Sequence, residues 1–374
     1  MEKENNLKEV AKVFFKLGCI AFGGPAAHIA MMEDEVVKKR EWMTREHFLD
    51  LIGATNIIPG PNSTEMTMHC GYERAGWKGL VTAGACFIFP AVAITAALAW
   101  VYQKYGQLPQ VEPFVYGIKP AVIAIIVSAL FSLGKKALKS VELAILGIAT
   151  VVVSLLGVNE ILALAGCGLA GILLYFIKQT GKTANGFYPF IFLQIPAAAA
   201  QAGNLKIFLI FLKIGAILYG SGYVLFAFLD AELVGKGLLT RAQLIDAIAA
   251  GQFTPGPVLS TATFIGWQMN DAWGAAVATL GIFLPSFLFV ALLNPLIPRL
   301  RKSKVMSAFL DAVNVAAVAV ILVVCIEMGK EAVMDWRTVI IALLGLAAAF
   351  GFKKLNSAFI VLGGAVTGWI LQFF

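Results

Sequence analysis

The sequence predicts an all-α polytopic membrane protein made of two homologous halves, in which helices are broken or re-entrant at Gly/Pro motifs. Three observations predict this fold class: an excess of apolar residues, an internal repeat, and Pro-Gly-Pro motifs at matched positions in apolar segments. The 374-residue chain is 59% hydrophobic and 14% charged, with a mean hydropathy of +0.83. So little charge cannot cover the surface of a soluble domain, and we expect the lipid bilayer to surround the protein.

Long apolar segments supply the candidate membrane spans. Residues 79–103 carry no charged side chain. Further apolar runs lie at 120–134, 141–158, 161–177, 275–297 and 305–326. Roughly 20 apolar residues cross the hydrocarbon core, and we expect about ten to fourteen spans because Gly and Pro interrupt several segments.

The net charge of +7 does not indicate a nucleic-acid-binding protein. The basic residues form short clusters between apolar runs, a pattern typical of cytoplasmic loops. We place in the cytoplasm the segments 135–139, 178–182, 236–241, 299–304 and 353–354, which leaves 33–45 outside. The expected location is the cytoplasmic (inner) membrane, and a homodimer is one assembly that we allow for.

An internal repeat divides the chain. Segments 14–25 and 43–61 match segments 211–222 and 239–257. The matched pairs include Lys16 and Lys213, Gly23 and Gly220, Thr44 and Thr240, Asp50 and Asp246, and Pro90 and Pro285. We expect a first transporter repeat at 1–180, a linker at 181–186 and a second repeat at 187–374. If 187–200 also crosses the membrane, each repeat has an odd number of spans and the halves are inverted.

The Gly/Pro motifs predict helix N-termini inside the membrane. Pro-Gly-Pro stands at 59–61 and 255–257, and Gly-Gly-Pro at 23–25 is matched by Gly-Ser-Gly at 220–222. A helix N-terminus exposes unpaired N–H groups and carries about half a positive charge, which an anion neutralises. Four such ends, two from each half, predict an anion site. The expected binding residues are Gly23, Gly24, Pro25, Gly60, Asn62, Ser63, Thr64, Gly220, Ser221, Gly222, Gly256, Ser260 and Thr261.

Two matched lysines strengthen the prediction of an anion site. Lys16 precedes Gly23, and Lys213 precedes Gly220, by the same interval of about two helical turns. Each lysine therefore lies on the helix face of its glycine break and would offset the charge of a dianion. The alternative is that each lysine reaches toward the lipid headgroups. An ionisable residue within an apolar helix favours the functional interpretation.

Four titratable residues are candidate proton carriers. Glu65 and His69 lie one turn apart after the first Pro-Gly-Pro motif and could relay a proton. Asp50 and Asp246 occupy matched positions ahead of the two motifs. The alternative for these aspartates is a structural ion pair with the arginine that precedes each of them, Arg45 or Arg241.

No metal, cofactor or catalytic site is expected. The five cysteines form no Cys-x-x-Cys pair, and the three histidines fit neither a zinc-binding motif nor a Ser-His-Asp set. The phosphate-binding motif of ATP-driven proteins is also missing from the sequence. Transport by this chain would therefore be secondary or passive, and the chain is not expected to be an enzyme.

Several quoted stretches resemble one known family. FGGPAAHIAMMEDEVV at 22–37, PGPNSTEMTMHCGYERAGWKG at 59–79, and GQFTPGPVLSTATFIGW at 251–267 resemble the chromate ion transporter family in its long, two-half form. The resemblance covers nearly the whole chain. It implies an inner-membrane protein that exports chromate and is driven by protons or the membrane potential. Gly220-Ser221-Gly222 departs from the Gly-Gly-Pro pattern, which leaves open whether both halves contribute equally to the site.

Three functions remain in competition. The first is a secondary transporter of chromate, with sulfate or a related oxyanion as an alternative substrate because both are tetrahedral dianions. The second is a passive channel for sulfate or another anion, lined by the same helix ends. The third is an intramembrane enzyme, for which the sequence offers no nucleophile and base.

Overall fold

The computed structural model describes residues 2–106, 108–178, 203–219, 222–293, 303–352 and 355–373. Within these ranges the chain folds into 14 α-helices and no strand, which confirms the predicted all-α fold. The expected linker 181–186, the marginal span 187–200, Gly220 and Ser221 lie outside the described residues.

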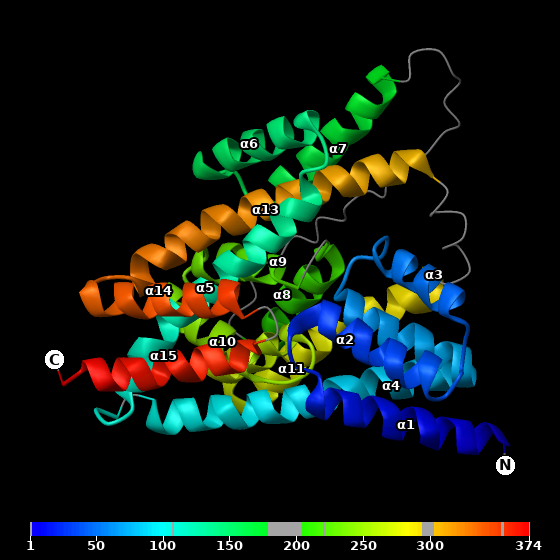
Figure 1. The fold of residues 1–374 in the computed structure, drawn as a ribbon, viewed down its shortest axis with the longest axis horizontal. Coiled ribbons are helices and arrows are strands. Elements are labelled where there is room, and N and C mark those ends of the chain that lie inside the picture. The colour runs from blue at the N-terminus through cyan, green and yellow to red at the C-terminus, as the bar shows by residue number, and fades with distance from the viewer. Residues whose placement is uncertain are drawn as a thin grey trace.

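The two repeats have the same order of elements (Figure 1). The first contains α1 (Glu2–Ile20), α2 (Gly24–Met32), η1 (Glu33–Lys38), α3 (Arg45–Thr55), α4 (Asn62–Tyr105), α5 (Glu112–Ala137), α6 (Val141–Leu155) and α7 (Glu160–Lys178). The second contains α8 (Asn204–Ile217), α9 (Val224–Leu229), η2 (Asp230–Val234), α10 (Arg241–Phe253), η3 (Val258–Ser260), α11 (Thr261–Leu293), α13 (Lys304–Ala332), α14 (Trp336–Gly351) and α15 (Ser357–Leu371). Here η1 and η2 are π-helical turns and η3 is a 3₁₀ turn.

The Pro-Gly-Pro motifs break the chain between helices, as predicted. The first motif lies between α3 and α4, and the second lies between α10 and η3. Their glycines adopt positive φ angles, 142° at Gly60 and 88° at Gly256, which other residues rarely adopt. The first repeat also breaks at Gly23 and Gly24, whose φ angles are 100° and 79°.

Two hydrogen bonds join these breaks across the repeats. The N–H of Gly60 donates to the carbonyl of Leu218 at 2.6 Å, and the N–H of Gly256 donates to the carbonyl of Ala21 at 2.7 Å. Ala21 and Leu218 directly follow α1 and α8, so each accepting carbonyl belongs to an open helix end. The Pro-Gly-Pro loop of each half therefore closes the first helix of the other half. A reciprocal contact of this kind is the mark of an approximate two-fold relation.

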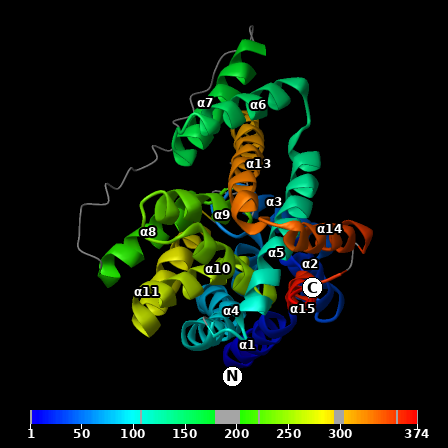
Figure 2. The ribbon, with the colours of Figure 1, turned by 90° about the vertical axis from the view of Figure 1, so that its left-hand side faces the viewer.

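Equivalent helices run antiparallel. Lys139, just after α5, pairs with Asp311 near the start of α13 at 2.6 Å, while Tyr116 near the start of α5 donates to Asp335, just after α13. In the same way, Gln103 near the end of α4 donates to Asp271 at 2.8 Å, in the first third of α11. In Figure 2 the long axes of α5 and α13 both run close to vertical, although the chain follows them in opposite directions.

The last two helices of each repeat pack on the other repeat. Helices α14 and α15 pack against α5, while α6 and α7 pack against α13. Small residues allow these contacts: a Cβ at Gly368 would meet Gly117, and a Cβ at Gly171 would meet Ala308 and Ala312. The two repeats are therefore interlocked along α5 and α13.

The candidate membrane spans fall into two length classes. In the described part of the chain, five helices are long and apolar enough to cross a membrane, namely α4, α5, α7, α11 with η3, and α13. Helices α6, α14 and α15 are apolar but shorter. A helix of about 15 residues is about 22 Å long and the hydrocarbon core is about 30 Å thick, so these three helices are short for a full crossing.

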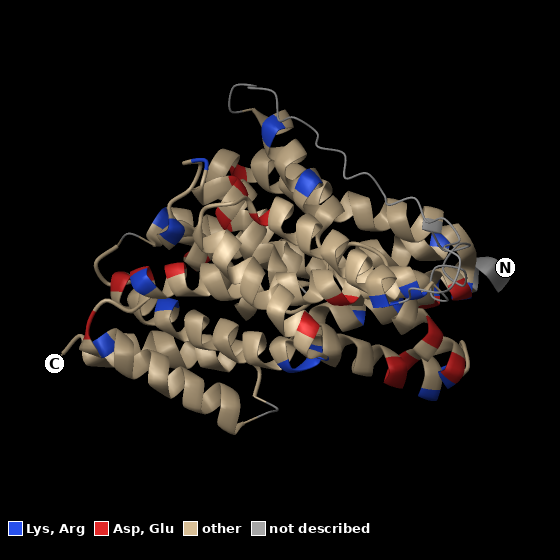
Figure 3. Ribbon diagram, turned by 90° about the horizontal axis from the view of Figure 1, so that it is seen from above, with Lys and Arg blue, Asp and Glu red and all other residues tan. Residues whose placement is uncertain are grey.

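One charged loop does not lie on the side where the sequence placed it. Arg241 pairs with Glu331 at 3.4 Å, whereas Lys139 pairs with Asp311. Glu331 and Asp311 are about 30 Å apart along α13. Segments 236–241 and 135–139 therefore lie at opposite ends of α13, and their expected common placement is wrong. Figure 3 shows that charged residues gather near helix ends and in loops, while long helical stretches have none.

We expect Gly256→Ala to destabilise the fold by about 1–3 kcal/mol, because φ is +88° and the new Cβ would meet Ala91 at 3.0 Å. Thermal unfolding of the purified protein in detergent measures this loss. Gly166→Ala in α7 is the control, since its Cβ would meet nothing within 4 Å. Equal melting temperatures for the two variants would contradict a structural role of the Gly256 loop.

Candidate functional site

A cavity of 990 Å³ lies between α5 and α13. From α5 it is lined by Ser128, Ser132 and Lys136, which recur every fourth residue and so share one helix face. From α13 it is lined by Ser307 and Asn314, among other residues. The cavity therefore has partly polar walls between two otherwise apolar helices.

Five of the predicted site residues line this cavity. Gly23, Gly24 and Pro25 enter it at the start of α2, Asn62 at the start of α4, and Gly222 just before α9. The cavity thus brings the glycine break of each repeat together with the first Pro-Gly-Pro helix. The other predicted residues that the structure describes do not line it.

The start of α2 is an open helix N-terminus. Gly23 stands at the N-cap position, where it has no side chain to cap the helix, and no side-chain cap occurs among the described residues. Pro25 occupies that turn, where its missing N–H costs nothing. The remaining N–H groups and the helix dipole make this end suited to an anion. Asn62 lies on the same cavity, and its side-chain amide donates to Asn56 at 2.8 Å.

Two lysines line the cavity, and one of them is neutralised by an aspartate. Lys139 is held by Asp311 at 2.6 Å, and both residues are part of the lining. Lys136 also lines the cavity, and no ion pair to it occurs among the residues that the structure describes. Its charge is therefore available to a bound anion.

The hydroxyls after the Pro-Gly-Pro motifs lie deeper than predicted. Ser63, Thr64, Ser260 and Thr261 are at most 2% exposed and lie outside the cavity lining. The Ser63 hydroxyl lies 3.2 Å from Nδ1 of His28. The hydroxyls of Thr64 and Ser260 have no hydrogen-bond partner in the described structure.

Glu65 lies in this buried layer. Its side chain is fully buried, and neither carboxyl oxygen has a hydrogen-bond partner among the described residues. A Cβ at Gly60 would collide with Oε1 of Glu65 and with the Ser286 hydroxyl, so these three residues meet. A glycine at position 60 therefore makes room for the carboxyl group.

The other three candidate proton carriers lie on three different helices. His69 is also buried, one turn after Glu65 on α4, whereas Asp50 is exposed on α3. Asp246 is buried on α10, where it accepts a hydrogen bond from Tyr102 at 2.6 Å and lies 3.7 Å from Lys119. The alternative pairing of Asp246 with Arg241 is not observed.

Both arginines instead pair with the acidic turns. Arg241 pairs with Asp230 of η2 at 3.0 Å, and Arg45 pairs with Glu33 of η1 at 3.1 Å. Because Glu33 and Asp230 occupy matched positions, this ion pair is repeated in both halves.

The two matched lysines also form equivalent ion pairs. Lys16 pairs with Glu35 at 3.1 Å, and Lys213 pairs with Glu232 at 2.7 Å. Neither lysine lines the cavity. The structure thus places each lysine against a glutamate of its own π-helical turn.

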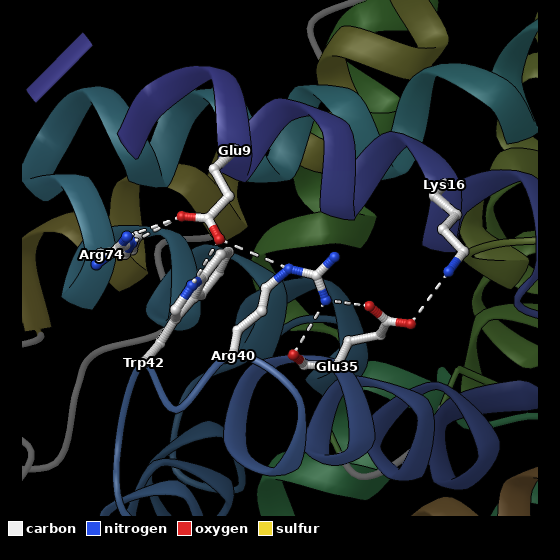
Figure 4. Close-up of polar contacts among 6 residues, drawn as sticks. All are labelled: Glu9, Lys16, Glu35, Arg40, Trp42 and Arg74. Atoms are coloured by element: carbon white, nitrogen blue, oxygen red, sulfur yellow. Dashed lines mark hydrogen bonds and ion pairs between the residues drawn. The ribbon is translucent and has the colours of Figure 1, made fainter. Parts of the chain in front are cut away.

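In the first half this pair belongs to a larger network (Figure 4). Arg40 joins Glu35 to Glu9, and Glu9 also accepts hydrogen bonds from Arg74 at 2.8 Å and from the Trp42 indole at 3.3 Å. These residues come from α1, η1, the following loop and α4. The network therefore fixes α1 and α4 to the segment that leads into α3.

The polar face of α5 and the two glutamates, Glu35 and Glu232, were not predicted from the sequence. Ser128, Ser132 and Lys136 interrupt an apolar run at helical spacing, which is a readable signal. Glu35 and Glu232 occupy matched positions in the repeat and could have been paired with the lysines. Ser286 and Lys119 gave no comparable signal, because only the fold brings them to Glu65 and Asp246.

Sequence comparison relates the whole chain to transport proteins. A family model described as chromate transporter matches residues 8–172 and again 205–369. A chromate transport protein of Cupriavidus metallidurans is 31% identical over 376 residues, covering 97% of this chain and 93% of that protein. A probable chromate transport protein of Synechococcus elongatus is 30% identical, covering 98% of this chain and 95% of its own.

A shorter relative matches only part of the chain. The uncharacterized transporter YwrA of Bacillus subtilis is 24% identical over 128 residues, which are 34% of this chain and 72% of that protein. No solved structure gives a significant match.

The stabilisation of the fold by the Glu35 carboxylate depends on pH. Burial raises the pKa of this carboxyl, but hydrogen bonds from Lys16, Arg40 and Lys39 outweigh burial and lower the pKa from 4.5 to about 2. Because the folded-state pKa is depressed, the stabilisation is present above the unfolded value of 4.5 and is lost as the pH falls toward 2.

We therefore expect Glu35→Gln to lower the stability by about 1–2 kcal/mol at pH 7, because it removes charge-assisted hydrogen bonds from partly exposed partners. Melting temperatures of wild type and variant, measured in detergent from pH 7 to pH 3, should converge below pH 4.5. A difference that stays constant over this range would exclude the carboxylate as its source.

Proposed function

This chain belongs to the chromate transporter family, and we propose that it is a secondary transporter that exports chromate across the cytoplasmic membrane. Members of the family are transport proteins and not enzymes. The observation that carries the proposal is the cavity between α5 and α13, into which the open N-terminus of α2 and Lys136 both project.

In the proposed binding mode the oxyanion lies at the start of α2. Gly23 and Gly24 have no side chain, so the oxygens of a tetrahedral dianion can approach the backbone N–H groups closely. Asn62 and Ser128 supply neutral donors, and Lys136 supplies one positive charge. Sulfate has the same charge and shape, so it is expected to compete for this site.

The matched lysines fit an anchoring role in this proposal. Lys16 and Lys213 are each neutralised by a glutamate, and a lysine held in this way contributes little to an anion elsewhere. Their ion pairs connect α1 and α8 to the turns that follow α2 and α9. We propose that they fix the helix breaks in position around the substrate.

The two repeats are proposed to be inverted across the membrane. The antiparallel course of α5 and α13 supports this arrangement, because equivalent helices that cross in opposite directions require a two-fold axis in the membrane plane. The repeat relates segment 33–45 to the segment around Arg241, so 33–45 belongs at the same end as Lys139. That end then carries most of the basic loops and is assigned to the cytoplasm.

The cavity is proposed to load from the cytoplasm. Its lining includes Lys136 and Lys139 at the end of α5 and Ser303 before α13, all at the basic end of the molecule. Positive charge at an entrance raises the local concentration of a dianion. This orientation agrees with an exporter that takes its substrate from inside the cell.

Glu65 is the proposed site of proton coupling. A charged carboxylate without a partner in the protein interior costs several kcal/mol, so Glu65 is expected to hold a proton in this state. It stands three residues after Asn62, which lines the cavity, so its proton and the substrate are close enough to influence each other. Export would then be driven by proton entry or by the membrane potential.

The direct test is chromate uptake into everted membrane vesicles, where export appears as uptake. We expect saturable uptake with respiratory energy, collapse with an uncoupler, and competition by excess sulfate. Flux that does not saturate and ignores the uncoupler would instead support the passive anion channel. Uptake equal to that of empty vesicles would refute chromate transport by this chain.

Lys136→Gln should raise the KM for chromate about 5- to 10-fold, because the variant loses one positive charge in the cavity, worth about 1 kcal/mol. Lys135→Gln is the matched control, since Lys135 lies 4.3 Å from the ring of Phe131 and does not line the cavity. Kinetics in everted vesicles measure both variants. The same KM for both would remove Lys136 from the binding site.

Glu65→Gln mimics a carboxyl group that always holds its proton. We expect proteoliposomes with this variant to exchange chromate across the membrane but to lose acceleration by an imposed pH gradient, several-fold in wild type. Glu73→Gln, at a partly exposed position on the same helix, should keep the acceleration. A normal response to the gradient in the Glu65 variant would place proton coupling elsewhere.

A further inference from the structure

The pseudo-two-fold relation is broken at one pair of equivalent helices. In the second half, α10 packs against α4, α5, α13 and α15, and its residues from Leu244 to Gln252 are all buried. In the first half, α3 packs against α4 and η1, and fewer than half of its residues are buried. The cavity occupies the space beside α3, where Gly53, Asn56 and Ile57 are part of its lining. The matching space beside α10 is filled by protein.

One cluster of charges ties α10 to the end of α13. Arg241 contacts Glu331 at 3.4 Å and Glu327 at 3.7 Å, in addition to Asp230. If the register of Pro90 and Pro285 is continued, Glu327 and Glu331 correspond to Ser132 and Lys136. Neither a serine nor a lysine can make the ion pair with Arg45 that would close α3 onto α5.

A second cluster ties α10 to the first half. Asp246 binds Tyr102 of α4 at 2.6 Å and faces Lys119 of α5 at 3.7 Å. In the same register Lys119 corresponds to Asn314, which lines the open cavity. Asp50, the counterpart of Asp246, is exposed. Of the charged groups that hold α10 against α5, Asp246 thus has its equivalent at the surface and Lys119 has its equivalent in the cavity.

We infer that the space beside α10 is a second, closed entrance to the substrate site, and that Arg241 with Glu327 and Glu331, and Asp246 with Lys119 and Tyr102, form the latch that closes it. The opposite state follows from the symmetry: α3 closes against α5 and α13 while α10 moves away from them. The inference rests on the proposed transport function, because only a transported substrate needs both entrances.

The latch stabilises the conformation described here, in which the cavity beside α3 is open and the space beside α10 is closed. Breaking a buried pair leaves one charge without a partner, so α10 can move only if the charges of Lys119 and Asp246 are compensated or removed. The open side has no equivalent pair to form. We therefore expect the latch to bias the equilibrium toward the state that loads from the basic end.

Cysteine labelling tests the latch without any measurement of transport. Two reporters are placed in a chain that lacks its five cysteines: Ser128→Cys in the open cavity, and Ala249→Cys, which matches cavity-lining Gly53 but is 5% exposed. Rates of reaction with a small polar maleimide are measured in membranes. Ser128→Cys should react at least about 10-fold faster than Ala249→Cys in the otherwise unchanged protein.

Latch variants should reverse this order. Lys119→Met together with Arg241→Gln should speed labelling of Ala249→Cys and slow that of Ser128→Cys, each by about 10-fold. Lys330→Gln is the control, because Lys330 pairs with Glu327 but does not touch α10 through any ion pair that the described residues show. Slowing at Ser128→Cys distinguishes a change of state from unfolding, which would expose both reporters.

If the variant with Lys119→Met and Arg241→Gln does not fold, exchanging the charges of Lys119 and Asp246 provides a second test. Lys119→Asp combined with Asp246→Lys should restore slow labelling of Ala249→Cys, whereas Lys119→Asp alone should not. Fast labelling of Ala249→Cys in the unchanged protein, or unchanged rates in every folded latch variant, would overturn the second entrance. Chromate uptake could persist in either case, so failure of this inference does not imply failure of the transport function.

Discussion

The architecture depends on closing helix ends that stand inside an apolar protein. A broken helix leaves N–H and C=O groups unpaired, and a bilayer supplies no water to satisfy them. Two hydrogen bonds solve this problem here. The N–H of Gly60 donates to the carbonyl of Leu218, and the N–H of Gly256 donates to the carbonyl of Ala21. Each half lacks the partner that its own broken end needs, so the pair of halves is the smallest unit in which these ends are satisfied.

The scaffold is nearly symmetric, but its charges are not. The pairs of Lys16 with Glu35 and of Lys213 with Glu232 are repeated, and so are the kinks near Gly76 and Asp271. By contrast, Lys136 corresponds to an acidic residue in the other half, and the acidic residue is held by an arginine. A symmetric frame with asymmetric charges gives a protein whose two halves make different ion pairs at equivalent positions.

Much of the fold could be predicted from local rules. Apolar length predicted helices, the repeated motifs predicted two halves, and the rarity of positive φ outside glycine predicted the breaks at Gly60 and Gly256. The expected ten to fourteen spans stay a prediction: the described residues contain five long apolar helices and three shorter ones, and hydropathy does not show where a break leaves a helix shorter than the bilayer core. The placement of segment 236–241 was wrong: Lys236 and Arg241 pair with the nearby Glu232 and Asp230, and only the contact of Arg241 with the distant Glu331 reveals at which end of α13 the segment lies.

The candidate site was predictable in part. Gly23, Gly24 and Asn62 reach the cavity because helix starts are marked by local sequence, and local sequence was available. The partners of Lys16 and Asp246 come from other helices, and charge alone does not say whether a lysine faces a ligand or a carboxylate.

The position of helix α5 has a consequence for biosynthesis, because its neighbours α10, α13, α14 and α15 all belong to the second repeat. At about 5–20 residues per second, the ribosome finishes α15 roughly 12–47 s after α5, so the set of neighbours around α5 is complete only after that time.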